Sequence, residues 1–305
     1  MGLAAARLIE TLNRQWESCE EKLNVSFEFF PPNSPEMADT LWNSVVKLAR
    51  FSPAFVSVTY GAAASTRDRT HAVIERLVKE TDLNPVPHLT CINASKEEIA
   101  EIVSRYQALG INHIVALRGD LLPEAKDTGG DFFYANDLVS FLRERGIQNI
   151  SVAAYPETHP EARSARQDLD NLKRKVDAGA NHIITQFFYD NCAFLRFRDK
   201  CLTAGIDVPI TPGILPISNY RQVERFASGC GTKVPTWMAK LFEGLEDDVE
   251  TRRLIGASLA LEQVKLLINE GIDDLHIYTL NRAELTNAIC HALGLANRAT
   301  SKTKA

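Results

Sequence analysis

The chain has 305 residues, of which 45% are hydrophobic, and its formal net charge at pH 7 is -5. This length and apolar content suffice for a large core, and no low-complexity linker divides the chain, so we expect one domain over residues 1–305. The acidic balance without a basic stripe argues against a nucleic-acid partner. No segment is expected to span a membrane. Residues 1–20 contain Arg7, Glu10 and Arg14, which predicts an amphipathic helix and not a signal peptide.

The pattern of cysteines and histidines predicts a cytoplasmic protein without a metal site. No two cysteines form a Cys-x-x-Cys motif and several lie in apolar stretches, which predicts reduced core thiols in a cytoplasmic protein. The seven histidines are scattered, without a His-x-x-x-His or Cys-His cluster, so we expect no metal site. The six cysteines are Cys19, Cys91, Cys192, Cys201, Cys230 and Cys290.

Short apolar segments recur along the chain, and several end on residues useful for chemistry. The clearest are NVSFEFFPP at residues 24–32 and NHIVALRGD at residues 112–120. Both are predicted as buried strands, because apolar runs of this length bounded by Gly or Pro are too short for a core helix. Further strands are expected at residues 54–60, 85–91, 149–155, 182–188, 208–215 and 273–280.

Amphipathic stretches of helical period lie between these strands. They occupy residues 36–50, 68–80, 96–109, 137–145, 165–178, 193–204 and 220–227. Such alternation requires a parallel sheet, because each crossover needs a helix to return the chain to the same end. Eight strands favour a (β/α)8 TIM barrel, with extra helices at residues 1–20 and 235–270 and a flexible tail over residues 296–305. A doubly wound open sheet is the alternative, disfavoured because no Gly-x-Gly-x-x-Gly follows a strand.

Glu28 is a candidate acid near the end of the first strand. It shares one face of that strand with Ser26 and Phe30. A carboxyl group among aromatic side chains is costly to ionise, so its pKa should rise and it would donate a proton near neutral pH. The alternative is a structural glutamate in a salt bridge, and the spacing alone leaves both interpretations open.

Arg118, Gly119 and Asp120 end the strand at residues 112–120. They would form either an ion pair that closes the barrel, or an arginine for an anion and a carboxylate for a polar ring, with Gly119 allowing close backbone approach. Because a Gly-containing loop follows this strand end, the functional interpretation is favoured.

A polar stripe runs along the helix predicted at residues 165–178. Asp168, Asn171 and Lys175 are spaced by three and four residues and therefore line one face. Such a stripe is ordinarily a solvated surface. With Arg174 beside it, however, it would equally hold the phosphates and hydroxyls of an extended ligand.

Two glutamines are each followed closely by aromatic residues. Gln186 precedes an aromatic run at residues 187–189, and Gln222 lies one helical turn before Phe226. An amide beside an aromatic platform suits a planar heterocycle that needs both stacking and edge hydrogen bonds. Ordinary core packing is the other interpretation.

The segments at successive strand ends resemble the signature segments of methylenetetrahydrofolate reductase of the bacterial type. The resemblance covers residues 24–293 in order, and it is specific because many separate strand ends agree. It departs from the family in the loop at residues 121–133, where Glu124, Lys126 and Asp127 stand in a loop that is often rich in Pro and Gly. The segments are FEFFPP (27–32), VSVTYG (56–61), PHLTC (87–91), ALRGD (116–120), AAYPETHP (153–160), ITQFF (184–188), PGILP (212–216) and YTLNR (278–282).

This resemblance implies a TIM barrel that binds FAD non-covalently and reduces 5,10-methylenetetrahydrofolate to 5-methyltetrahydrofolate with hydride from NADH. It implies a ping-pong mechanism that supplies methyl groups for methionine synthesis, with Glu28 as general acid and Asp120 between flavin and pterin. A homo-oligomer is expected. The implied FAD contacts are Thr59, Tyr60, Ala62, His88, Arg118, Gly119, Asp120, Ala135, Tyr155, His159, Asp168, Asn171, Arg174 and Lys175. The implied folate contacts are Thr59, Asp120, Gln186, Gln222, Phe226 and Arg282, and Phe226 would stack on either substrate in turn.

Two other functions are compatible with such a barrel. One is a pterin-binding barrel that transfers a methyl group to a corrinoid or a thiol, which would need no flavin and would purify colourless. The other is a ligand-sensing barrel that binds a nucleotide and reports to a partner, for which an appended interaction domain would be the expected mark.

Overall fold

The computed structural model describes residues 23–60, 64–120 and 130–297. Within these ranges eight parallel strands close into a barrel in sequence order, and the last strand pairs with the first. The predicted (β/α)8 barrel is therefore confirmed and the open doubly wound sheet is excluded. The strands are β1 (Asn24–Phe29), β2 (Val56–Val58), β3 (Pro85–Thr90), β4 (His113–Leu117), β5 (Asn149–Ala154), β6 (His182–Phe187), β7 (Ile210–Ile214) and β8 (Asp274–Tyr278).

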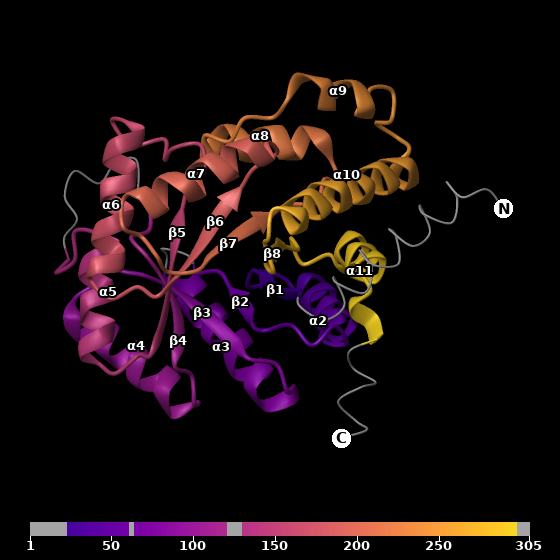
Figure 1. The fold of residues 1–305 in the computed structure, drawn as a ribbon. Helices are drawn as coiled ribbons and strands as arrows, with labels where there is room; N and C mark the ends of the chain where they lie inside the picture. The colour runs from indigo at the N-terminus through magenta and orange to yellow at the C-terminus, as the bar shows by residue number, and fades with distance from the viewer. Residues whose placement is uncertain (1–22, 61–63, 121–129, 298–305) are drawn as a thin grey trace.

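Helices surround the strands, which lie at the centre of the view in Figure 1. The pair predicted before the last strand is present as α9 and α10, whereas the helix predicted over residues 1–20 lies outside the described residues. A 3-10 turn, η1 (Leu295–Asn297), precedes residues 298–305, which also lie outside them. The helices are α2 (Pro35–Ala49), α3 (Ala64–Glu80), α4 (Lys96–Ala108), α5 (Ala135–Glu144), α6 (Ala165–Asp177), α7 (Asn191–Thr203), α8 (Tyr220–Cys230), α9 (Thr236–Phe242), α10 (Val249–Asn269) and α11 (Ala283–Ala292).

The structure differs from the sequence prediction at three helices. α11 was not predicted, although buried Thr286, Ile289 and Cys290 follow the helical period; it packs against α2 beside the seam between β1 and β8. α3 begins at Ala64, four residues before the predicted start. α8 continues to Cys230 and ends at Gly231, whose positive φ of 70° is a left-handed cap that glycine adopts without strain.

Alternation along β1 separates the core from the barrel interior. Phe27 and Phe29 are fully buried in the hydrophobic core that the helices cover. Ser26 and Glu28 point to the opposite side, where both approach His276 of β8. Glu28 therefore faces the interior of the barrel and not the two phenyl rings.

The seam between β1 and β8 is fixed by side-chain hydrogen bonds to the backbone. The Asn281 amide donates to the Phe30 carbonyl at 2.9 Å and accepts from the Phe30 N–H at 3.0 Å. The Thr279 hydroxyl donates to the Glu28 carbonyl at 2.6 Å. Asn281 has a positive φ of 57°, which asparagine tolerates better than most residues. The end of β1 at Glu28 is therefore tied to the segment that follows β8.

The described cysteines differ in exposure. Cys91, Cys201 and Cys290 are buried free thiols, as predicted, and Cys230 is half-buried. Cys192 is exposed at the start of α7, so the core prediction is wrong there. The carboxylate of Asp190 caps α7 by accepting a hydrogen bond from the Cys192 N–H, and in this first turn of the helix the Cys192 thiol is exposed. Cys19 lies outside the described residues. Among the described helices, none is long and apolar enough to cross a membrane.

Candidate active site

A cavity of about 590 Å³ lies at the carboxyl ends of the strands. Each of the eight strands contributes to its wall, either directly or through the residues that follow it, and α8 covers one side of its mouth. This is the end of a TIM barrel where active sites are built. The lining residues are Glu28, Thr59, Tyr60, His88, Val115, Leu117, Ala153, Tyr155, Ile184, Gln186, Phe187, Leu215, Arg225, Phe226, Gly229, Cys230, Tyr278 and Leu280.

The carboxyl group of Glu28 lies between two imidazoles. Its Oε2 atom is 3.5 Å from Nε2 of His88 and 3.7 Å from Nε2 of His276. Burial raises the pKa of Glu28 and lowers the pKa of His88 to about 4 and that of His276 to about 3. Near neutral pH both imidazoles are therefore uncharged and supply no cation to stabilise a carboxylate. The predicted rise in the Glu28 pKa is confirmed, but its neighbours are imidazoles and not the expected phenyl rings.

His276 and Tyr278 are site residues that the sequence analysis did not single out. His276 is fully buried, and its Nδ1 atom lies 2.7 Å from the Ser26 hydroxyl. The Tyr278 hydroxyl donates to the Thr185 carbonyl at 2.8 Å. Alternation in the sequence Leu-His-Ile-Tyr of β8 was the available signal, because it places a histidine and a tyrosine together on the inner face.

His88 has an imidazole nitrogen without a hydrogen-bond partner. Its side chain is 9% exposed, and Nε2 makes no hydrogen bond with the residues that the structure describes. Buried polar atoms in folded proteins are nearly always paired, so an exception in a cavity wall indicates a group that a ligand would satisfy.

Tyr155 and Gln186 form a polar pair in the wall of the cavity. Their side chains are hydrogen-bonded to each other, and burial raises the pKa of Tyr155 to about 12. The side-chain carbonyl oxygen of Gln186 also accepts a hydrogen bond from the backbone N–H of Phe187 at 3.0 Å. Phe226 of α8 is 37% exposed at the mouth of the same cavity. Of the two predicted combinations, Gln186 and Phe187 line this cavity together, whereas Phe226 lines it without Gln222.

Arg118 forms an ion pair, but its partner is Glu161 and not Asp120 of the same strand end. Arg118 Nη2 lies 2.6 Å from Glu161 Oε2, in the segment after β5. Gly119 has a positive φ of 89°, and a Cβ atom there would lie 2.7 Å from the Ile92 side chain. Glycine is therefore required, and the close approach is to the segment after β3.

Asp120 does not line the cavity, but its charge acts on Tyr155 and Cys230 in the cavity wall. Asp120 follows Gly119 in the sequence, and its side chain is exposed. Burial, and to a smaller degree the charge of Asp120, raises the pKa of Cys230, which lines the cavity wall. A carboxylate is thus available beside any ligand that fills the cavity.

The stripe on α6 is only partly a solvated surface. Lys175 Nζ donates to the Ala153 carbonyl at 2.5 Å, and burial lowers the Lys175 pKa to about 8. The carboxylate of Asp168 accepts from the His159 N–H at 2.8 Å and holds the loop after β5. Arg174 is exposed and Asn171 is half-buried. The solvated interpretation is therefore wrong for Lys175, because α6 turns this side of the stripe toward the end of β5.

The remaining predicted contacts are not part of the cavity wall. Gln222 is half-buried in the first turn of α8, and Ala135 is the first residue of α5. Arg282 is exposed at the N-cap of α11 and lines a small neighbouring cavity, which shares Tyr278 and Leu280 with the large one. Ala62 lies outside the described residues.

This barrel, with a buried acid in the wall of a cavity at its carboxyl end, has the architecture of a TIM-barrel enzyme. A sequence model of the methylenetetrahydrofolate reductase family matches residues 11–294, and the chain belongs to this family. The chain is 55% identical over 286 residues to the 5,10-methylenetetrahydrofolate reductase of Escherichia coli strain K12, covering 94% of this chain and 96% of that one. It is therefore related to oxidoreductases that act on a folate.

Two further proteins mark more distant similarity. Methylenetetrahydrofolate reductase (NADH) 1 of Arabidopsis thaliana is 38% identical over 285 residues, covering 88% of this chain and 48% of the plant protein. A solved structure from Clostridium thermocellum, described as binding two copies of 5-methyl-5,6,7,8-tetrahydrofolic acid, has a TM-score of 0.62 at 16% identity, covering 94% of this chain and 99% of that one. Similarity at that identity shows the fold alone.

Proposed function

We propose that this protein reduces 5,10-methylenetetrahydrofolate to 5-methyltetrahydrofolate with hydride from NADH, using non-covalently bound FAD. The observation that carries the proposal is the Glu28 carboxyl group, which burial favours in the protonated form beside two uncharged imidazoles. We further propose that the protein acts in the cytoplasm as a homo-oligomer and supplies methyl groups for methionine synthesis. Membership of the family supports the substrate.

The residues present fit a flavin dinucleotide. The cavity volume falls in the range of about 300–1,000 Å³ common for small-molecule sites, and its wall offers Thr59, His88 and Gln186 to a planar polar ring. The partnerless Nε2 of His88 supports a ligand hydrogen bond there. Arg174 and Lys175 would hold the diphosphate from α6. FAD, when bound, accepts a hydride equivalent from NADH and passes it to the folate.

The proposed role of Glu28 is to open the bridging methylene group. Its carboxyl proton transfers to N10 of 5,10-methylenetetrahydrofolate as the bond from N10 to the methylene carbon breaks, which leaves an iminium cation at N5. Hydride then adds to the methylene carbon and gives the 5-methyl group. Asp120, whose charge acts on groups in the cavity wall, would hydrogen-bond the pterin and favour the cation by its negative charge. General acid catalysis of this kind requires the acid to be protonated at the working pH.

A single cavity supports a ping-pong mechanism. Phe226 of α8 lines this cavity, and a ring there would stack on the nicotinamide and on the folate in turn. One substrate must then leave before the other binds.

The variant Glu28→Gln tests this function. It removes the acid while nearly preserving its shape, so NADH should still reduce the flavin at close to the normal rate. Reoxidation by methylenetetrahydrofolate should slow by about 10² to 10⁴-fold, the usual contribution of a general acid. Stopped-flow absorbance measures each half-reaction separately, and Glu262→Gln on the exposed face of α10 is the matched control.

Equal losses in both half-reactions would show that Glu28 has only a structural role. A colourless protein that binds no FAD even after reconstitution would contradict the proposal as a whole and would favour flavin-free methyl transfer.

A further inference from the structure

Arg225 is an unpaired cation at the mouth of the cavity. It is exposed on α8 and is the only Lys or Arg among the described residues that line the cavity. It makes no hydrogen bond or ion pair with any residue that the structure describes. The guanidinium is therefore available to a ligand without first breaking an internal contact.

No other charge in the cavity wall would neutralise an anionic ligand. The pKa of His88 is about 4, so its imidazole carries no positive charge near neutral pH, and the carboxyl group of Glu28 is never a cation. Asp120, whose charge acts on groups in the cavity wall, is acidic and would repel an anion. An anionic part of a ligand would therefore be stabilised at the mouth, where Arg225 lies, and not inside the barrel.

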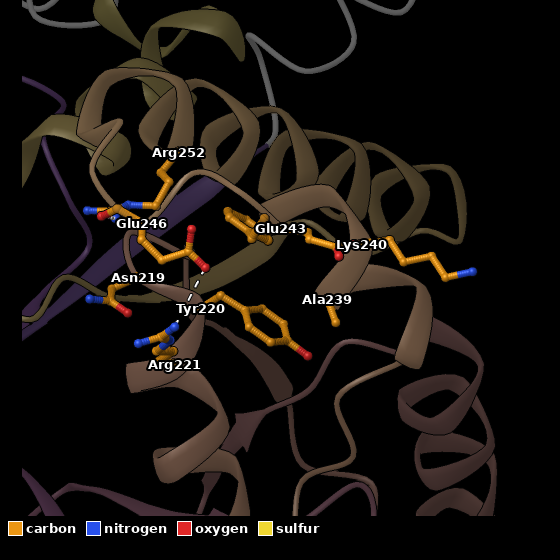
Figure 2. Close-up of a pocket in the computed structure, with 9 residues that line it drawn as sticks. Asn219, Tyr220, Arg221, Ala239, Lys240, Glu243, Glu246 and Arg252 are labelled. Atoms are coloured by element: carbon orange, nitrogen blue, oxygen red, sulfur yellow. Dashed lines mark hydrogen bonds and ion pairs between the residues drawn. The ribbon is translucent and has the colours of Figure 1, made fainter.

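Arg221 provides an internal comparison on the same helix. It lies one turn before Arg225, but its Nη2 atom is 3.6 Å from Glu246 Oε1, an ion pair that Figure 2 shows across a second cavity of about 470 Å³. Arg221 thus already has an acidic partner within the protein. The two arginines share residue type and helix but differ in whether a partner is present.

We propose that Arg225 forms a carboxylate subsite that binds the glutamate tail of the folate. The inference rests on the proposed function. A pterin inside the barrel would direct its p-aminobenzoyl ring toward Phe226, and the glutamate attached to that ring would then leave the cavity beside Arg225. A guanidinium pairs with a carboxylate through two parallel hydrogen bonds, a geometry that the ammonium group of a lysine does not provide.

The subsite is tested by truncating both the protein and the ligand. Isothermal titration calorimetry on the flavin-loaded protein would compare tetrahydrofolate with tetrahydropteroate, which has the same rings but no glutamate. Arg225→Ala should weaken tetrahydrofolate binding by about 2- to 5-fold, as expected for an exposed ion pair, and leave tetrahydropteroate binding unchanged. Arg221→Ala is the matched control and should change neither affinity.

Steady-state kinetics gives a second readout. Arg225→Ala should raise the KM for methylenetetrahydrofolate with little change in kcat, because a contact remote from the reacting carbon binds substrate and transition state alike. Arg225→Lys should recover part of the lost affinity.

Two results would overturn the subsite while leaving the proposed function intact. One is equal weakening of tetrahydrofolate and tetrahydropteroate, and the other is a raised KM for NADH alone, which would assign Arg225 to the NADH diphosphate. Failure of the wild-type protein to bind tetrahydrofolate would instead refute the proposed function and, with it, the subsite.

Discussion

The barrel interior contains histidines at both ends, but His113 and His182 at the amino end differ from His88 at the carboxyl end in whether their ring nitrogens have hydrogen-bond partners. At the amino end His113 Nε2 and His182 Nδ1 each lie 2.8 Å from the Ser151 hydroxyl, and His182 Nε2 lies 2.8 Å from Thr211 Oγ1. At the carboxyl end His88 Nε2 has no hydrogen-bond partner and lies 3.5 Å from Glu28.

This difference separates structural from functional polar groups. Pairing at the amino end offsets the cost of removing polar atoms from water, so those histidines stabilise the fold. An unpaired nitrogen at the carboxyl end costs free energy in the free protein, and a ligand that fills the cavity would supply its partner. The same residue type therefore has opposite consequences at the two ends.

The largest expected effect on stability is at the amino end. His182→Leu would leave the Thr211 hydroxyl without its partner and would remove one partner of Ser151, so the free energy of unfolding should fall by about 2–4 kcal/mol. Urea denaturation of the flavin-free protein measures this. The flavin affinity, corrected for the fraction of the protein that is folded, should be unchanged.

The double variant His182→Leu/Thr211→Val is the control for that prediction. Replacing both partners by apolar groups removes the unsatisfied hydroxyl, so it should be more stable than the sum of the two single variants predicts. Strict additivity would show that the hydrogen bond between His182 and Thr211 contributes nothing.

Acidification is expected to destabilise the protein progressively. Burial lowers the pKa of His113 and His182 to about 4 and that of His276 to about 3. The unfolded chain binds these protons near pH 6.5 and the folded chain does not, so the stabilisation is complete above about pH 6.5 and is lost as the pH falls toward 4. Glu28, with its raised pKa, contributes in the opposite direction. Urea denaturation between pH 7.5 and 4.5 should show the net loss.

His182→Leu should show a shallower pH dependence than the wild type, because one of these groups is gone. The same slope in both proteins would mean that His182 takes up its proton equally in the folded and unfolded states.

The smallest effect on stability is expected at the carboxyl end. His88→Leu removes an unpaired nitrogen and replaces the imidazole with an apolar side chain, so the free energy of unfolding of the flavin-free protein should change by less than about 0.5 kcal/mol. The flavin dissociation constant should rise, because the ligand loses a hydrogen bond. A variant that loses stability but keeps flavin affinity would reverse the comparison between the two ends.

Much of the cavity wall could be predicted from the sequence, because the residues at the strand ends follow recognisable apolar runs. Glu28, His88 and Gln186 lie on or at the end of strands whose apolar runs are readable, and parallel strands carry those residues to the same edge. Gln222 and Arg282 show the limit of this approach. The sequence pattern predicted that both would contact the ligand. The orientation of their helices leaves both outside the cavity wall.

Periodicity by itself determined the strand and helix order of this protein, and with it the barrel, because alternation of short apolar runs with amphipathic helices admits few arrangements. Only the tertiary structure decided which polar groups meet. The pKa of Glu28, the partnerless nitrogen of His88 and the burial of Lys175 depend on atoms from strands and helices far apart in the chain. Hydrogen bonding and desolvation act over a few ångströms in space, a distance that residue spacing does not encode.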